Sequence, residues 1–118
     1  MLKQVPEVDA KIFDNTYYKE SMVLSLKEAF RQKTSGVVDD FKLATTSWGF
    51  KLEQIDCPLV VWQGGKDKQA PVKHAEIYAQ KIPKAQYRFL EEEGHISILH
   101  HYGEQILASA LQEPLLQN

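Results

Sequence analysis

The feature that most constrains the fold is a short apolar run at residues 59–62 (LVVW), which lies just before the pair Gly64-Gly65. A continuous run of β-branched and aromatic residues with such a boundary is typical of a buried strand in a parallel sheet. A second run of this kind follows at residues 86–90. The segment between the two runs has helical periodicity and begins at Pro71, a residue favoured at the first position of a helix. Two strands joined by a helix predict a parallel pair with a right-handed crossover.

Apolar residues that recur three and four positions apart predict further helices over residues 21–32, 37–46 and 99–112, the last of which ends before Pro114. In the first of these helices, Met22, Leu26, Ala29 and Phe30 are expected to form one buried stripe. Residues 1–20 show no clear period and predict an irregular lead-in. We therefore expect an α/β fold in a single domain over residues 1–118, with a helical segment at 1–50 and a strand–helix–strand–helix segment at 51–118.

Composition narrows the class of protein. The chain has 118 residues, of which 43% are hydrophobic and 25% are charged, as in ordinary globular proteins. A formal net charge of -2 without a run of Lys or Arg argues against a nucleic-acid or membrane-surface partner. A single cysteine, Cys57, excludes a disulfide within the chain and is expected to be buried at the entrance of the first strand. No segment has the pattern of a signal peptide or a membrane span, so we expect a cytoplasmic location.

Two residues follow the predicted strands directly and are candidates for chemistry. Asp67 lies in the loop after the first strand, and His95 lies in the loop after the second. In open parallel sheets, functional groups gather at the carboxyl ends of the strands, and neighbouring strands lie about 4.8 Å apart. An aspartate that accepts a hydrogen bond from one imidazole nitrogen fixes the tautomer of the histidine and stabilises the imidazolium. The sequence therefore predicts an acid–base pair of Asp67 and His95.

The motifs around these residues resemble those of a known family. Gly64–Asp67 (GGKD), with Pro71 four residues later, resembles the acid loop of α/β-hydrolases, and Gly94–Ser97 (GHIS) resembles the glycine-histidine motif after their last strand. The stretches at 48–55 and 58–64 are similar too, and the resemblance covers roughly residues 26–111. It implies a partial α/β-hydrolase fold preceded by cap-like helices, with Asp67 and His95 as the acid and base of a catalytic triad. It also implies a small-molecule substrate with an ester-like bond.

The nucleophile of that family is not found in this sequence. α/β-Hydrolases carry a serine on a G-x-S-x-G elbow between a strand and a helix, ahead of the acid and the histidine. Here Ser47-Trp48-Gly49 has Thr45 where the first glycine is required, and no predicted strand leads into it. The family's oxyanion hole comes from its N-terminal part, which has no counterpart here. Because an acid and a base alone do not complete this chemistry, we expect no activity from these residues by themselves, and whether they act in an enzyme stays open.

Two functions remain. The chain is either the C-terminal part of a hydrolase whose serine lies elsewhere, or a truncated, non-catalytic remnant that oligomerises or binds a partner. Since the strand at 59–63 is an inner strand in a complete hydrolase, its missing neighbour predicts pairing in a homodimer or with a chain that completes the sheet. Some relatives use an aspartate nucleophile, so the bond type is open. No cofactor and no metal are expected, because the spacings of His95, His100 and His101 match no zinc pattern.

Overall fold

A computed structural model describes residues 5–111, and this range contains five α-helices and two parallel β-strands. The helices are α1 (Glu7–Ile12), α2 (Thr16–Ala29), α3 (Ser35–Thr45), α4 (Val72–Lys81) and α5 (Ser97–Ala110), and a 3-10 turn, η2 (Leu52–Gln54), precedes the first strand. The predicted mixed α/β class is confirmed. The chain divides into two compact units: Phe13–Lys51 forms a helical unit, and α1 groups with the residues from Leu52 onward in an α/β unit.

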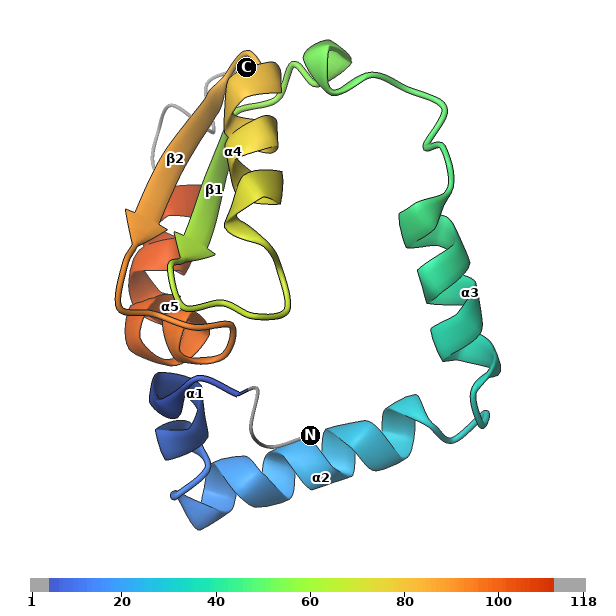
Figure 1. Cartoon of the computed structure of the whole chain (residues 1–118), viewed down its shortest axis with the longest axis vertical. Coiled ribbons are helices and arrows are strands. Elements are labelled where there is room, and N and C mark those ends of the chain that lie inside the picture. The colour runs from blue at the N-terminus through green and yellow to red at the C-terminus, as the bar shows by residue number, and fades with distance from the viewer. Residues whose placement is uncertain (1–4, 112–118) are drawn as a thin grey trace. The chain divides into compact units, whose positions relative to one another are not determined.

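The α/β unit has a two-stranded parallel sheet between helices. β1 (Leu59–Gly64) pairs with β2 (Ala85–Leu90) along their whole length. Trp62 of β1 contacts Tyr102 of α5. Tyr87 of β2 points to the other face of the sheet, where it interacts electrostatically with Glu76 of α4. Because side chains alternate across a strand, α4 and α5 cover opposite faces of the sheet (Figure 1). The predicted strand–helix–strand–helix order is therefore confirmed.

The core of the α/β unit is small, and its buried hydrophobic side chains are Ile12, Ala75, Ile82 and Ile98. Every residue of β1 is partly or fully buried, and its last two, Gln63 and Gly64, are buried. In β2, partly buried and exposed residues alternate from Ala85 to Arg88, and Phe89 is exposed as well. β1 thus has the two-sided shielding of an inner strand, although among residues 5–111 it pairs with β2 alone.

The helical unit has no such core. The side chain of Asn15 accepts a hydrogen bond from the Tyr17 amide at 2.9 Å and caps the start of α2. No described residue of this unit is buried, and most of its large apolar side chains are exposed. The predicted buried stripe is wrong here, since Leu26 and Phe30 are 49% and 47% exposed.

Other expectations from the sequence need correction or limits. The lead-in is not irregular, because α1 and the first turn of α2 lie within it. Cys57 is exposed, because the chain before β1 runs along the surface. Residue 112 and Pro114, the predicted end of the last helix, lie outside the described residues. Within residues 5–111, no helix is both long enough and apolar enough to cross a membrane.

Candidate acid–base site

Backbone amides of the same loop fix the side chain of Asp67. The N–H groups of Gln69 and Ala70 donate hydrogen bonds to Oδ1 of Asp67 at 2.7 and 2.8 Å. Aspartate favours local turns of this kind, in which its side chain binds the amides two and three residues later in the chain. One carboxylate oxygen is occupied in this way, and the other, Oδ2, is left to face outward from the loop.

The structure brings together the two residues that the sequence predicts for the site. Oδ2 of Asp67 lies 2.9 Å from Nδ1 of His95. The Asp67 side chain is 7% exposed, whereas the His95 side chain is 41% exposed. Because an ionised carboxylate only accepts hydrogen bonds, Nδ1 donates the proton. In the neutral ring this leaves the lone pair on Nε2, which is the arrangement a general base needs.

The surroundings of Asp67 favour its charged form. Burial raises the pKa of the carboxyl group, but hydrogen bonds from the Ala70 amide, the His95 ring and the Gln69 amide outweigh it. A charge on His95 acts in the same direction, so the pKa of Asp67 lies below its ordinary value of 3.8. At neutral pH the histidine therefore faces a carboxylate.

The two loops that carry the pair are joined beyond the ends of the strands. Gly65 N–H donates to the Leu90 carbonyl at 2.9 Å, and Lys66 N–H donates to the Glu93 carbonyl at 2.8 Å. A Cβ atom at Gly64 would lie 2.5 Å from the Glu93 carbonyl oxygen, closer than real Cβ atoms approach. The Gly64-Gly65 pair therefore lets the acid loop lie directly against the histidine loop.

A third residue of the site, Asp9 on α1, was missed by the sequence analysis. Its side chain is buried, with the residue 1% exposed. Its carboxylate accepts hydrogen bonds from the backbone N–H groups of His95 (2.9 Å), Ile96 (3.0 Å) and Ser97 (2.8 Å). The first amides of a helix have no partner within it, and here they belong to the start of α5. No local sequence signal links residue 9 to residues 95–97, because the contact exists only in the folded chain.

A second carboxylate–histidine pair joins Glu93 of the same loop to His101 of α5. Nδ1 of His101 is 3.0 Å from Oε2 and 3.1 Å from Oε1 of Glu93, which is a buried residue. Glu91 and Glu92 are exposed, as acidic residues in a loop usually are, whereas Glu93 is buried. Among residues 5–111, no three His, Cys, Asp or Glu side chains are arranged to hold a metal ion.

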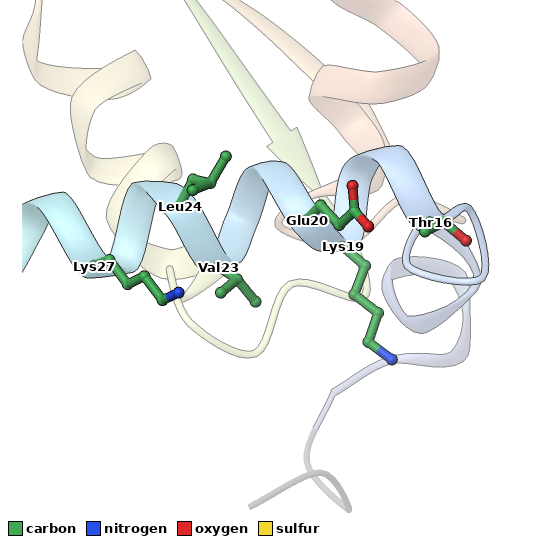
Figure 2. A pocket seen from close by; sticks show the side chains of 6 residues that line it. All are labelled: Thr16, Lys19, Glu20, Val23, Leu24 and Lys27. Carbon is green, nitrogen blue, oxygen red and sulfur yellow. The ribbon is translucent and has the colours of Figure 1, made fainter.

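A separate hollow lies along α2 in the helical unit (Figure 2). The described residues that line it are Thr16, Lys19, Glu20, Val23, Leu24 and Lys27. Two apolar side chains lie among charged ones, and neither Asp67 nor His95 belongs to this lining. Ser47, the serine rejected as a nucleophile, also lies in this unit, in an exposed irregular segment after α3.

The comparisons with known proteins return no relative. No family model, no curated protein and no solved structure matches the chain. The geometry of Asp67, His95 and the loops that hold them is therefore the basis for assigning a function.

Proposed function

We propose that this chain is the C-terminal part of an α/β-hydrolase and supplies the acid and the base of a catalytic triad. The reaction is hydrolysis of an ester-like bond, with a nucleophile that lies outside these residues. The observation that carries the proposal is the 2.9 Å contact between Asp67 Oδ2 and His95 Nδ1. A shielded carboxylate next to a half-exposed imidazole is the asymmetry that an acid–base pair requires.

In this proposal each residue has one task. Nε2 of His95 takes the proton from the attacking hydroxyl and then gives it to the leaving group. Asp67 keeps the ring in the Nδ1–H tautomer and stabilises the imidazolium between these steps. Proton transfer by a positioned side chain contributes roughly 10²- to 10⁴-fold to a rate.

The edge of β1 is the proposed place for the rest of the enzyme. β1 is shielded on both faces like an inner strand, yet within residues 5–111 only β2 pairs with it. An unpaired edge of this kind attracts a further strand. We place the nucleophile-bearing segment beside β1, where it completes the sheet. A second copy of this chain is the other occupant that the edge would accept, and it would give a homodimer.

The competing function is a non-catalytic module that oligomerises or binds a partner. The observation in its favour is the exposure of large apolar side chains in the helical unit, among them Leu24, Phe41 and Leu43. Such residues mark interaction surfaces when they are contiguous. In this alternative, Asp67 and His95 are inherited and perform no chemistry.

A serine-directed fluorophosphonate probe separates the two functions. The full chain is co-expressed with the segment encoded directly upstream, and labelling of the complex is measured. A functional triad predicts labelling that requires both parts and that falls by about 10⁴-fold in His95→Ala and Asp67→Asn. His74→Ala, at an exposed position on α4, serves as the matched control and should label normally.

Two results of this experiment would contradict the enzyme proposal. One is an upstream segment that does not encode a strand, a nucleophile elbow and a helix in that order. The other is a labelled complex whose reactivity is indifferent to His95→Ala. Sedimentation of the chain alone then shows whether it forms a homodimer, as pairing of the β1 edge with a second copy would require.

A further inference from the structure

We propose that Asp9 is a positioning residue for His95. Its buried carboxylate on α1 fixes the backbone from which the imidazole reaches Asp67. The catalytic meaning of this inference rests on the proposed function, but the geometry can be tested in this chain alone.

His95 is held between two carboxylates. Its backbone N–H donates to Oδ2 of Asp9 at 2.9 Å, and its ring Nδ1 donates to Oδ2 of Asp67 at 2.9 Å. The Asp9 contact fixes the main chain of the residue, and the Asp67 contact fixes the ring. A shift of the main chain would therefore move the ring relative to Asp67.

No nearby side chain replaces Asp9 as the cap of α5. Ile96, at the N-cap position, makes no side-chain capping hydrogen bond. The hydroxyl of Ser97 accepts a hydrogen bond from the Gly94 amide at 2.8 Å. The three amides of residues 95–97 all donate to one carboxylate that lies 86 to 88 residues away in sequence. Without it, these buried and partly buried donors must find new partners, and the loop must rearrange.

Gly94 shows how closely the carboxylate is seated. A Cβ atom at this position would lie 2.4 Å from each carboxylate oxygen of Asp9. The loop backbone therefore lies directly on the carboxylate, and a side chain at position 94 would force one of them to move. Positional errors of about 1 Å in catalytic groups cost on the order of 10²-fold in rate, so this seating bears directly on the base.

Long-range ¹H–¹⁵N NMR of the full chain tests the inference through the tautomer of His95, under conditions in which the ring signals are those of neutral imidazole. In the unmodified chain we expect the Nδ1–H form. In Asp9→Asn, which keeps the shape but offers one acceptor oxygen, we expect the ring to shift toward the Nε2–H form that free imidazole prefers. Glu7→Gln removes a carboxylate from the same helix at an exposed position and is the matched control. The exposed ring of His74 is the internal reference.

Gly94→Ala is the complementary variant, because it keeps the Asp9 carboxylate but prevents its close contact with the backbone at position 94. It should shift the His95 tautomer as Asp9→Asn does, with the far-UV signal of the helices retained. An unchanged Nδ1–H signal in either folded variant would overturn the inference.

Amide hydrogen exchange of the unmodified chain gives a test that does not depend on a variant's folding. The N–H groups of His95, Ile96 and Ser97 should be protected together with the amides of α1. Exchange as fast as that of an exposed loop amide such as Lys68 would also overturn the inference. Neither readout requires catalysis, so failure of the fluorophosphonate experiment and failure of this inference are distinct results.

Discussion

A side chain at position 94 would collide with Asp9, since a Cβ atom there would lie 2.4 Å from both carboxylate oxygens. We therefore expect Gly94→Ala to lower the free energy of unfolding of the α/β unit by about 2–4 kcal/mol, because either the carboxylate or the loop must move. Urea unfolding measures the loss. In a Trp48→Phe background, the remaining Trp62 reports on this unit.

Gly103→Ala is the matched control for that substitution. Gly103 lies inside α5, and an added Cβ would meet no other atom within 4 Å. Alanine is the better helix former, so stability should rise by roughly 0.5–1 kcal/mol. Equal losses in the two variants would mean that the close approach to Asp9 has no energetic importance.

The lowered pKa of Asp67 predicts a pH-dependent contribution to stability. A carboxyl group whose folded pKa lies below its ordinary value of 3.8 stabilises the fold above that pH. This stabilisation is lost as the pH falls through the folded pKa. Asp67→Asn should therefore cost about 2 kcal/mol at neutral pH. Its free energy of unfolding should converge with that of the unmodified chain in acid. A difference that grows on acidification would show that Asp67 is not held as a carboxylate.

Removal of the His101 side chain should destabilise the chain, because Glu93 would remain buried without its imidazole partner. We expect His101→Ala to cost about 1–3 kcal/mol. His74→Ala, at an exposed position on α4, should change stability by less than about 0.5 kcal/mol. Thermal or urea unfolding of the two variants compares a paired histidine with a surface one.

Tyr87→Phe should leave the protein equally stable or stabilise it by up to about 1 kcal/mol. The Tyr87 hydroxyl is buried and has no hydrogen-bond partner among the described residues. Burial and then the charge of Glu76 raise the pKa of this phenol above its ordinary value of 10.0. The unfolded chain therefore ionises first, and stability is lost as the pH rises past 10.0. The advantage of Tyr87→Phe should accordingly widen in alkali, and a clear loss at neutral pH would reveal an unseen partner of the hydroxyl.

The sequence predicted the α/β unit well because its signals are local. The apolar run at 59–62 and the glycines after it mark β1 and its loop, and the order of elements places Asp67 and His95 at the same edge of the sheet. β1 extends past the apolar run to Gly64 because it pairs with β2, where Gly64 lies opposite Leu90. Strand ends are set by the partner strand, which a single run of residues does not reveal.

The N-terminal region and the carboxylates were harder to predict for physical reasons. Asn15 is a capping residue, and this signal would have placed the start of α2 correctly. The burial of Asp9 and Glu93 has no comparable signal, because an acidic residue in a polar stretch is usually solvated. Both become buried only through partners that are distant in sequence or in the next helix.

The division of the chain into units has a consequence for how such a protein can vary. The described part of the α/β unit is built from two separate stretches, residues 5–12 and 52–111, and the helical unit lies between them in the sequence. Asp9 in the first stretch accepts a hydrogen bond from the His95 amide in the second. This hydrogen bond joins the two stretches without any residue of the helical unit. We therefore expect the α/β unit to keep the contact between Asp67 and His95 when another sequence replaces Phe13–Lys51.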